Sequence, residues 1–471
     1  MIGRVKEKQY LLEMTEREEA QLIAVYGRRR VGKTFLVRNT FANNILFAHT
    51  GLYNVKLQAQ LDAFRDSLLR HGAQKIGRLH SWREAFLALE NLILCNNSKQ
   101  RIVFLDELPW LDTPKSSFVA AFEHFWNAWA SAQQNLTVVF CGSATSWIIN
   151  KVLKNKGGLN NRVTGHVALE PFTLAECREY AASLGLTYSD RDIAEGYMVF
   201  GGIPYYWSFL RKGESLAQSI DRLLFSQNGP LCHEFLELYS SIFKSEDAYM
   251  NIVTTLAKKK TGMPMNELSS SVGVPKGGNL SRHLEELEQC GFIRRCTSWG
   301  KKKKDAIYQL SDNFTLFHFA FIDGDSHPDE HFWTASSNNS SVLAWKGLAF
   351  ERICLAHVPQ IKKSLGISGV LTHTYAWHHR PDDVYPVGAQ IDLIIERADH
   401  IVNVCEIKWS DAPFVIDKEY DAKLRTKMGV FIDVTGIRNA VHLTMVTTFG
   451  VVHNMYWNNV QSEVILEELF Q

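Results

Sequence analysis

The 471-residue sequence lacks the features that would assign it to several specialised classes of protein. No apolar run approaches the roughly 20 residues that a membrane-spanning helix needs, and the N-terminus has no stretch typical of a signal peptide. The formal net charge is +1, from 51 Lys and Arg against 50 Asp and Glu, so overall charge does not indicate a nucleic-acid partner. We therefore expect a cytoplasmic protein without a membrane partner, in which any DNA-binding surface is local.

Cysteine and histidine also occur without the spacing of a metal site. None of the eight cysteines forms a CxxC pair, and the 17 histidines show no zinc-binding pattern. Most of the cysteines stand in apolar surroundings, which favours buried free thiols in a reducing compartment. The sequence therefore predicts neither a disulfide framework nor a structural zinc site.

A phosphate-binding loop is the most specific motif that the sequence does contain. Residues 27–34 fit the pattern GxxxxGK[ST], after the apolar run 22–26 and before the helical pattern 34–38. The two glycines let consecutive backbone N–H groups converge on phosphate oxygens, and the following helix adds the positive end of its dipole. A plain turn between a strand and a helix is the alternative, but the terminal lysine and hydroxyl favour ATP. The predicted nucleotide-binding residues of the loop are Gly27, Arg28, Arg29, Arg30, Val31, Gly32, Lys33 and Thr34.

Two further strand ends are expected to complete this site. Lys33 would neutralise the β- and γ-phosphates, and Thr34 would bind Mg²⁺. An apolar strand pattern about 70 residues downstream ends in Asp106 and Glu107; Asp106 would hold Mg²⁺, and Glu107 would polarise the attacking water. A third apolar run ends near Ser143, which either contacts the γ-phosphate or the water, or is only a turn residue after a strand.

These residues resemble the AAA+-like archaeal-type P-loop ATPases of the STAND group, in which an ATPase core, a winged helix and a C-terminal nuclease-like domain share one chain. Residues 1–7 are similar to the opening motif F/I-x-x-R-x-x-E of that family, and residues 201–206 to its GG-hydrophobic-P-x-Y motif in a helical lid. The resemblance implies that Arg162 is an arginine finger or a γ-phosphate sensor. This chain departs from the usual L-Y-G-R before that arginine, so a solvated loop arginine is the equal alternative.

The middle of the chain has the pattern of a winged helix-turn-helix. Helices are predicted over 252–257, 265–272 and 280–290, followed by strands over 292–296 and 306–310. Asn279 or Ser281 can cap the third helix. Ser281, Arg282 and His283 would then face a major groove, and the basic turn Lys301–Lys304 would contact phosphates beside it. A lid or protein-docking module with a solvated basic turn is the alternative.

Two adjacent strands in the C-terminal third carry a second group of charged residues. The apolar runs 388–395 and 401–409 are separated by a polar turn, so pairing would bring Asp392 beside Glu406 and Lys408. Side chains alternate along a strand, so Glu406 and Lys408 share one face. Two carboxylates at that distance repel each other unless a cation lies between them, and a lysine beside them can orient a water.

This second group resembles the PD-(D/E)xK signature of restriction-endonuclease-like folds. The resemblance implies catalytic roles for Asp392, Glu406 and Lys408, metal binding by Asp392 and Glu406, and a further acidic residue on an upstream helix, for which Glu351 is the match. Gln390 lies on the same strand face as Asp392 and could line the same pocket. Because Glu-x-Lys is common on surface strands, a salt-bridged solvated face is the alternative.

The expected fold class is α/β: a P-loop NTPase (AAA+-like) core with a helical lid, a winged helix-turn-helix and a restriction-endonuclease-like α/β C-terminal domain. A chain of this length is ample for about three domains with full cores. The predicted boundaries are 1–170 for the ATPase core, 171–244 for the lid, 245–323 for the winged helix, 324–339 for a linker and 340–471 for the nuclease-like domain.

The leading functional hypothesis is a protein that binds and hydrolyses ATP, interacts with DNA and uses ATP to gate a Mg²⁺-dependent nuclease-like domain. The alternative is a nucleotide-dependent switch that acts on a protein partner, with the C-terminal domain as a non-catalytic scaffold. The cofactors implied are ATP and Mg²⁺. An arginine finger acting in trans would require a homo-oligomer, whereas one acting in cis would suit a monomer.

Overall fold

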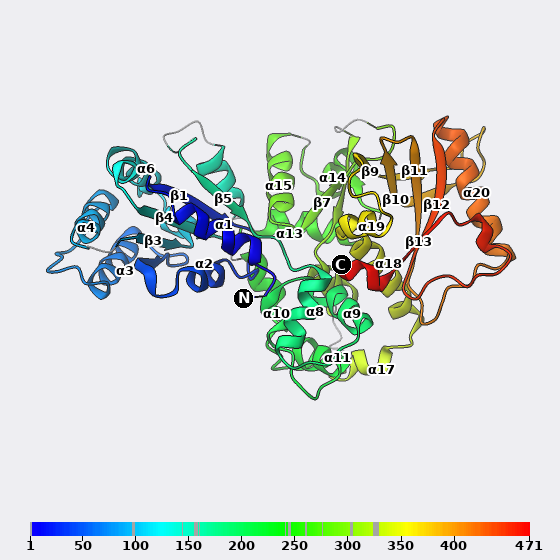
Figure 1. Ribbon diagram of the computed structural model, residues 1–471, viewed down its shortest axis with the longest axis horizontal. Helices are drawn as coiled ribbons and strands as arrows, with labels where there is room; N and C mark the ends of the chain where they lie inside the picture. Colours follow the sequence, from blue (N-terminus) through cyan, green and yellow to red (C-terminus); the bar gives the residue numbers. More distant parts are fainter. Residues whose placement is uncertain are drawn as a thin grey trace. The chain divides into compact units, whose positions relative to one another are not determined.

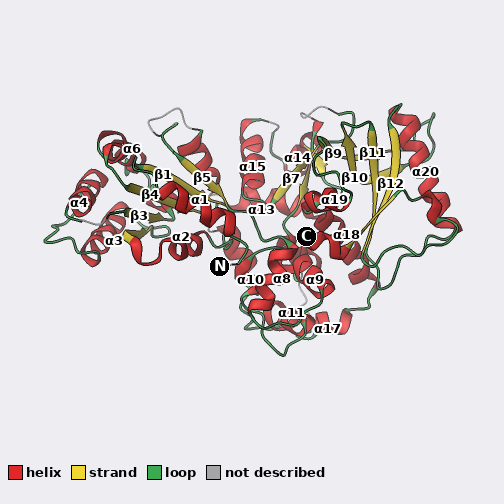
Figure 2. Ribbon diagram, in the orientation of Figure 1, coloured by secondary structure: helices red, strands yellow, loops and turns green. Residues whose placement is uncertain are grey.

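The computed structural model consists of two compact units. The first comprises residues 1–171, 237–246 and 285–290, and the second comprises residues 172–236, 247–284 and 291–471. Figure 1 traces the chain, and Figure 2 distinguishes its helices from its strands. The structure describes residues 2–96, 99–143, 145–154, 159, 161–240, 242–243, 246–259, 261–275, 277–301, 305–323 and 329–471.

A parallel five-stranded sheet forms the centre of the first unit. Its strands lie in the order β2-β3-β4-β1-β5, and all neighbours pair in parallel. The predicted α/β core with a parallel sheet is confirmed, and the near-continuous apolar runs suit a sheet that is covered on both faces. The strands are β1 (Gln21–Tyr26), β2 (Ile45–Thr50), β3 (Arg101–Asp106), β4 (Leu136–Gly142) and β5 (Gly165–Ala168).

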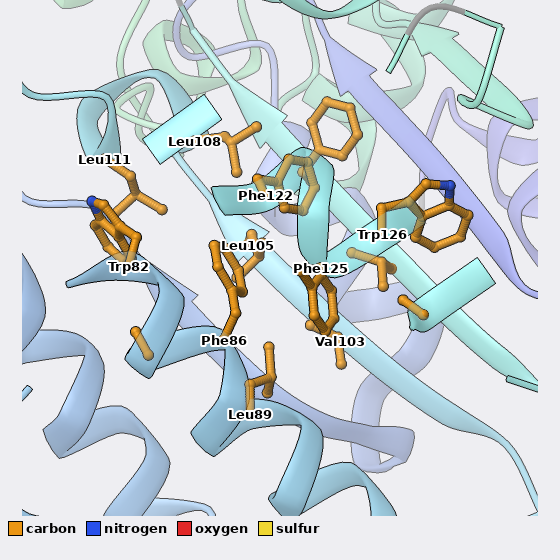
Figure 3. Close-up of a cluster of buried hydrophobic side chains, with 14 of the residues drawn as sticks. Trp82, Phe86, Leu89, Val103, Leu105, Leu108, Leu111, Phe122, Phe125 and Trp126 are labelled. Carbon is orange, nitrogen blue, oxygen red and sulfur yellow. The ribbon is translucent and has the colours of Figure 1, made fainter. Parts of the chain in front are cut away.

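Aromatic side chains from two helices cover one side of this sheet (Figure 3). Phe86 of α4 stacks on Phe125 of α6 with ring centroids 5.0 Å apart, and both rings belong to the buried cluster that includes Val103 and Leu105 of β3. These rings therefore pack directly against the strand that ends in Asp106. The helices of this unit include α1 (Val5–Thr15), α2 (Lys33–Phe41), α3 (Leu57–Arg70), α4 (Trp82–Leu94), α5 (Leu108–Leu111), α6 (Phe118–Ala128) and α7 (Thr145–Trp147).

The strand order places three chain segments at one edge of the sheet. The phosphate-binding loop follows β1, Asp106 ends β3, and Ser143 follows β4. Since β3, β4 and β1 are neighbours and run in parallel, their carboxyl ends meet at the same edge. This topology assembles the residues that the sequence placed about 70 and 110 positions apart.

The second unit begins with short helices that the sequence caps clearly. Thr173 and Ser189 both form capping boxes, with Glu176 and Asp192 as the reciprocal partners. Position 202 requires glycine, because a Cβ there would lie 1.9 Å from the carbonyl oxygen of Phe172. The helices are α8 (Leu174–Ser183), α9 (Asp190–Phe200), α10 (Pro204–Trp207) and α11 (Leu216–Ile220); the residues of α12 (Glu234–Ser240) are divided between the two units.

The middle segment contains helices and a small antiparallel sheet, in the order β6-β8-β7. The apolar stripe of Leu280, Leu284 and Leu287 is buried as predicted. The predicted cap is wrong: the helix begins at Gly278, so Asn279 and Ser281 lie inside it. The elements are α13 (Glu246–Ala257), β6 (Met263–Pro264), α14 (Met265–Val272), α15 (Gly278–Gln289), β7 (Ile293–Cys296) and β8 (Ile307–Leu310).

The C-terminal part of the second unit is built on a mixed sheet in the order β13-β12-β11-β10-β9. Strands β9, β10 and β11 pair antiparallel, whereas β11, β12 and β13 pair in parallel. The antiparallel pairing that the sequence predicted for β10 and β11 is confirmed. The elements are α16 (Asn313–Phe321), α17 (Phe332–Ser336), α18 (Ser340–Ala356), α19 (Val358–Ser364), β9 (Thr372–His379), β10 (Ala389–Arg397), β11 (Ile401–Lys408), α20 (Lys418–Thr435), β12 (Ala440–Thr447) and β13 (Ser462–Ile465).

The turn after β7 docks on this mixed sheet. The backbone N–H of Trp299 donates to the carbonyl of Ala376 on β9 at 2.9 Å. The Trp299 ring contacts Tyr375 and Phe431, with centroids 5.1 and 5.7 Å away. The beginning of the predicted wing is therefore attached to the C-terminal sheet, an arrangement that the sequence did not predict.

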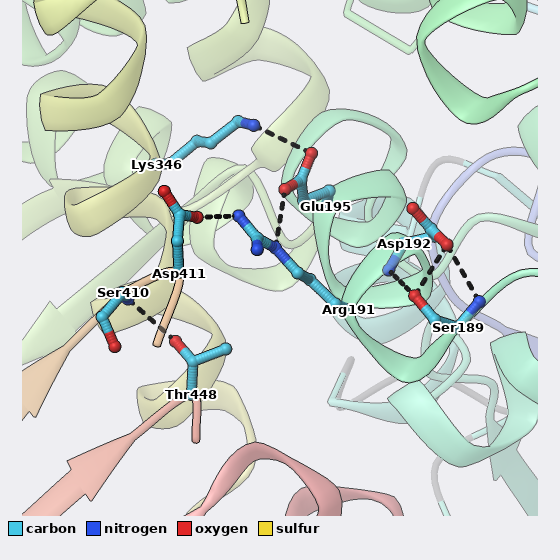
Figure 4. A network of polar contacts seen from close by, with 8 residues as sticks. All are labelled: Ser189, Arg191, Asp192, Glu195, Lys346, Ser410, Asp411 and Thr448. Carbon is cyan, nitrogen blue, oxygen red and sulfur yellow. Dashed lines mark hydrogen bonds and ion pairs between the residues drawn. The ribbon is translucent and has the colours of Figure 1, made fainter. Parts of the chain in front are cut away.

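Ion pairs and hydrogen bonds also connect α9 with the C-terminal part of this unit (Figure 4). Glu195 accepts from Lys346 of α18 at 2.9 Å, and Arg191 contacts both Glu195 and Asp411. Separately, the Nε2 atom of His357 accepts from the backbone N–H of Leu174 at 3.0 Å. The Lys346–Glu195 pair is the less exposed of these, whereas Asp411 is largely exposed and its pair contributes little to stability.

All eight cysteines are free, as predicted, but they are not all buried. Cys95 is exposed, and Cys232 and Cys296 are partly exposed, whereas the other five are buried. Among the described residues, no helix combines the length and the apolarity that crossing a bilayer requires.

Candidate functional sites

The phosphate-binding loop depends on glycines at its two ends. Gly27 has φ 145°, and a Cβ there would lie 2.3 Å from the carbonyl oxygen of Leu169. Gly32, with φ 95°, is the N-cap of α2, and Arg30 within the loop also has a positive φ of 69°. The left-handed turns bend the backbone so that the N-terminus of α2 opens toward the loop, which is the arrangement that binds phosphate.

Lys33 lies inside this loop, only 5% exposed. Its Nζ atom donates to the carbonyls of Gly27 and Arg28 at 3.0 and 2.9 Å and to the Ser143 hydroxyl at 3.2 Å. Burial lowers the pKa of Lys33, while the nearby Glu107 carboxylate raises it. The ammonium group thus donates to neutral acceptors, and charged phosphate oxygens could replace them as stronger acceptors.

Thr34 and Asp106 lie beside each other in this site. The Thr34 hydroxyl donates to Asp106 Oδ2 at 3.0 Å, and the backbone N–H of Glu107 donates to Oδ1 at 3.0 Å. The thiol of Cys141 also donates to Asp106. A hydroxyl and a carboxylate that meet at this distance are hard oxygen donors suited to Mg²⁺. These residues fit the metal that the sequence predicted.

Glu107 is held beside them in a left-handed backbone conformation, with φ 47° and ψ 50°. Its carboxylate accepts from the Ser143 hydroxyl at 2.6 Å and from the Ser143 backbone N–H at 3.0 Å. Such strain in a non-glycine residue is a feature of functional sites. The structure therefore brings Ser143 to both Glu107 and Lys33.

Other predicted residues of this site lie in different surroundings. Arg28 is buried, whereas Arg29 is partly exposed and Arg30 lies 3.5 Å from the carboxylate of Glu237. Val31 is buried. Arg162 is exposed in the turn before β5, and residue 160 of the predicted motif lies outside the described residues.

Two residues of this region were not assigned individually from sequence. Arg4 is buried and donates to the carbonyls of Glu170 and Val31 at 2.7 and 3.4 Å, which connects the opening motif with the loop. The contact of the Cys141 thiol with Asp106 was not predictable from the sequence, since a cysteine in a strand usually indicates only a buried position.

The C-terminal charged residues meet at the end of β10 and β11. Leu393, the residue after Asp392, pairs with Cys405, the residue before Glu406. The Gln390 side chain donates to Asp392 at 2.7 Å, which agrees with their predicted common face. Burial, with the nearby Asp392 charge, raises the pKa of Glu351 to about 7. The structure therefore brings the predicted acidic residues of α18 and β10 together.

Glu406 is engaged by residues that the sequence did not reveal. Its Oε1 atom accepts from Lys408 at 3.0 Å and from the Tyr420 hydroxyl at 2.5 Å, and its Oε2 atom accepts from Lys427 at 2.6 Å. Tyr420 and Lys427 lie on α20, 14 and 21 residues further along the chain. Burial opposes ionisation of Glu406, but the two lysines outweigh it and lower the pKa. Two ammonium groups already compensate this carboxylate.

A divalent metal between Asp392 and Glu406 does not fit this arrangement. Both oxygens of Glu406 hold strong donors, so a cation there would face two lysines. Within the described ranges, no group of three or more His, Cys, Asp or Glu side chains could hold a metal ion. The predicted metal role of Glu406 is therefore not supported by its contacts, and we derive no cleavage step from this group.

A large cavity of about 1370 Å³ lies inside the second unit, lined by the middle segment and the C-terminal sheet. Six cationic and four acidic side chains line it, and one acid, Glu267, is paired with Lys259. The cations are Lys259, Arg294, Arg295, Lys301, Arg352 and Arg380. The cavity exceeds the usual volume of small-ligand sites, about 300–1,000 Å³.

Of the α15 residues predicted to contact a DNA groove, not all are free of contacts with the protein. Ser281 and Arg282 are exposed, but the His283 ring packs against Tyr249 with centroids 4.6 Å apart. Lys301 is exposed, whereas Lys302, Lys303 and Lys304 lie outside the described residues.

Comparison with known proteins bears on the first of these sites. Residues 1–209 match a family of ATPase domains that is found predominantly in Archaea. This part of the chain is similar to the ATPase domains of that family. The matched region includes the phosphate-binding loop, Asp106, Glu107 and Ser143, and it ends within the first helices of the second unit.

Similar proteins extend beyond the ATPase domain. An uncharacterised protein of Methanocaldococcus jannaschii is 23% identical over 423 residues, covering 87% of this chain and 88% of its own length. A Walker-type ATPase of Pyrococcus abyssi is 20% identical, covers 67% of this chain and 95% of its own, and superposes with a TM-score of 0.47. The ORC2 protein of Aeropyrum pernix is 13% identical, with coverages of 68% and 95% and a TM-score of 0.33.

Proposed function

We propose that the protein hydrolyses ATP at the phosphate-binding loop and binds DNA through the cavity of its second unit, with the C-terminal domain acting as a binding module. The observation that carries the proposal is the polar network of Lys33, Thr34, Asp106, Glu107 and Ser143 at one edge of a parallel sheet. Each of these side chains has a partner that a bound nucleotide, metal or water could replace.

ATP binding would begin with Lys33. Its ammonium group would exchange the carbonyls of Gly27 and Arg28 for phosphate oxygens, which are stronger acceptors because they are charged. The loop N–H groups would hold the same phosphates. Thr34 and Asp106 would hold Mg²⁺, which supplies positive charge that stabilises the transferred phosphoryl group.

Hydrolysis would use Glu107 as the base for the attacking water. Its carboxylate must point toward the γ-phosphate, and the two hydrogen bonds from Ser143 restrict its orientation. Because Ser143 also contacts Lys33, one side chain links the phosphate-binding group with the base. We assign Ser143 a positioning role.

DNA binding is supported by the charge and the size of the cavity. Its lining has more cationic than acidic side chains although the whole chain is nearly neutral, which is the local surface that the composition required. The order of helices and antiparallel strands around it favours a winged helix, and the order α18-β9-β10-β11-α20-β12 favours a restriction-endonuclease-like domain. Since Glu406 is compensated by lysines, we favour binding over cleavage.

Two measurements on the full chain test this proposal. Phosphate release from ATP in Mg²⁺ should be fast in wild type and lost in Lys33→Ala. Fluorescence anisotropy with a labelled DNA duplex should show binding that weakens as salt rises. A protein that hydrolyses ATP but binds no DNA at low salt would refute the DNA part and favour a protein partner.

A further inference from the structure

Arg4 is the N-cap residue of α1, and its side chain is buried beside the phosphate-binding loop. The helix that it precedes packs on β5, because a Cβ at Gly165 would lie 2.9 Å from the Tyr10 hydroxyl and 3.0 Å from the Met14 side chain. Since both of these side chains belong to α1, their packing fixes the start of that helix. The fold itself therefore holds the Arg4 guanidinium in place.

One nitrogen of this guanidinium joins two segments that are far apart in the sequence. The Nη2 atom donates to the carbonyl of Glu170 at 2.7 Å and to the carbonyl of Val31 at 3.4 Å. Glu170 follows β5, whereas Val31 lies in the phosphate-binding loop. An Nη atom carries two N–H groups, so it can donate to both carbonyls at once. Arg4 therefore bridges the loop and the residues after β5, with the shorter bond to Glu170 as the anchor.

The same segment after β5 also contacts the beginning of the loop. The backbone N–H of Leu169 donates to the carbonyl of Tyr26 at 2.7 Å, and a Cβ at Gly27 would lie 2.3 Å from the Leu169 carbonyl oxygen. Leu169 thus packs on the first residue of the loop, while the next residue of the chain is tied through Arg4 to Val31. Two consecutive residues after β5 therefore hold the loop at both of its ends.

The loop needs such support because its backbone is unfavourable by itself. Arg30 has φ 69°, a left-handed conformation that costs free energy in a non-glycine residue, and it directly precedes Val31. The C=O and N–H groups of a trans peptide point to opposite sides, so a Val31 carbonyl that faces Arg4 turns the N–H of Gly32 away from Arg4. Backbone N–H groups at the start of a helix hold phosphate oxygens. Arg4 therefore sets the direction of one of these donors.

The charge of Arg4 is already balanced by the protein. Its Nη1 atom lies 3.7 Å from Oε1 of Glu7, three residues further along the chain. Burial raises the pKa of Glu170, and the charge of Arg4 opposes that rise. With a carboxylate beside one nitrogen and two carbonyls on the other, the guanidinium has the contacts of a structural bridge.

We propose that Arg4 is a positioning residue of the ATP site, which acts through the Val31 carbonyl to hold the phosphate-binding loop in the shape that accepts a triphosphate. This inference rests on the proposed ATP binding at that loop. Arg4 acts on the backbone that binds the phosphates and does not touch the nucleotide. Its effect is therefore independent of the base and extends to any ligand that carries a triphosphate group.

Calorimetric titration of the full chain with ATP and with inorganic triphosphate, each in Mg²⁺, tests this role. Arg4→Gln removes the charged bridge, Arg4→Lys keeps a charge that can still donate to the nearer carbonyl, and the exposed Arg17→Gln is the matched control. Arg4→Gln should bind both ligands about tenfold more weakly, the scale expected when a group that orients a ligand-binding residue is lost. Arg4→Lys should lie between Arg4→Gln and wild type, and the control should bind as wild type does.

Steady-state ATP hydrolysis and melting temperatures of the same samples provide the second readout. In Arg4→Gln the KM for ATP should rise more than kcat falls, because the contacts between Glu107 and Ser143 do not involve Arg4. A residue that only supports the fold would lower the melting temperature and leave the KM unchanged.

The results separate the inference from the proposed function. If Arg4→Gln weakens the binding of ATP but not of inorganic triphosphate, Arg4 acts on the nucleoside and the positioning role is wrong. If Arg4→Gln binds both ligands as wild type does, the inference fails and the proposed function survives. If wild type binds neither ligand, the proposed function fails as well. If Arg4→Gln does not fold, Arg4→Lys decides: equal weakening of both ligands supports the role, and unchanged binding overturns it.

Discussion

The group around Asp106 and the group around Glu406 both contain carboxylates and a lysine, but the carboxylates accept hydrogen bonds from different kinds of donor. In the first unit, Asp106 accepts from a hydroxyl, a thiol and a backbone N–H, all of them neutral. In the second unit, Glu406 accepts from Lys408 and Lys427 as well as from Tyr420. Neutral donors orient a carboxylate without cancelling its charge, whereas two lysines cancel it. These donors therefore leave the charge of Asp106 in place, whereas the lysines offset the charge of Glu406.

The same difference appears in what each group contributes to stability. Glu406 is 8% exposed and ties β11 to α20, so its ion pairs are part of the packing of that domain. The group around Asp106 lies at the end of a strand whose buried residues pack in an aromatic core, and its side chains are not part of that core. We infer that the first group can change partners during a reaction, whereas the second is mainly a structural link.

The largest effect is expected for Lys33→Ala. ATP hydrolysis should fall by about a thousandfold or more, since no other side chain can neutralise the phosphates from the same position. Phosphate release measures this, and circular dichroism should report an unchanged fold. The exposed Lys56→Ala is the control and should hydrolyse at the wild-type rate. If Lys33→Ala also hydrolysed ATP at that rate, the site would be assigned wrongly.

The next largest effect is expected for Glu406→Gln. The change should cost about 3 kcal/mol of unfolding free energy, because it leaves Lys408 and Lys427 without their buried counter-charge. Urea denaturation monitored in the full chain measures it. Glu419→Gln, which breaks the exposed pair with Lys423, should cost less than about 1 kcal/mol. Equal costs for the two variants would contradict a structural role for Glu406.

The acid dependence of stability sharpens this prediction. The pKa of Glu406 is lowered from 4.5 in the fold, so its stabilising contribution is complete above that pH and is lost as the pH falls through the folded value. Wild type should therefore lose stability more steeply in acid than Glu406→Gln does. Melting temperatures measured between pH 7 and the acid limit check the sign, and parallel curves would refute it.

A smaller effect is expected for Ser143→Ala. Loss of the hydroxyl that holds Glu107 should reduce ATP hydrolysis by about tenfold while nucleotide affinity changes little, because Lys33 keeps its phosphate contacts. Steady-state hydrolysis and binding of a fluorescent ATP analogue separate the two quantities. The exposed Ser131→Ala is the matched control. A variant that hydrolyses like wild type would reduce Ser143 to a turn residue.

No effect is expected for Lys408→Ala on metal-dependent DNA cleavage. Wild type and variant should leave supercoiled and linear DNA intact in Mg²⁺ or Mn²⁺, with and without ATP, because Glu406 is compensated by lysines. Chelation by EDTA should abolish ATP hydrolysis and leave DNA binding unchanged. If wild type cleaved DNA and Lys408→Ala did not, the structural role of Glu406 would be contradicted, and the nuclease hypothesis would be restored for Glu406 and Lys408.

Local patterns predicted much of the fold. The loop from Gly27 to Thr34 and the strand that ends in Asp106 were recognisable because each is a short segment whose residue types have direct backbone or metal consequences. The pairing of β10 with β11 followed from two apolar runs and a polar turn. The start of α15 at Gly278 was missed, since Asn279 and Ser281 are good caps that the actual fold places inside the helix.

Sequence by itself determined where the phosphate-binding loop, the acidic strand ends and the Glu-x-Lys pair stand, because these depend on spacing along one segment. Only the tertiary structure decided which charges meet. Tyr420 and Lys427 reach Glu406 from a helix that follows β11. The physical reason is that the state of a carboxylate or a guanidinium depends on neighbours within a few ångströms, and the fold brings those neighbours from distant parts of the chain.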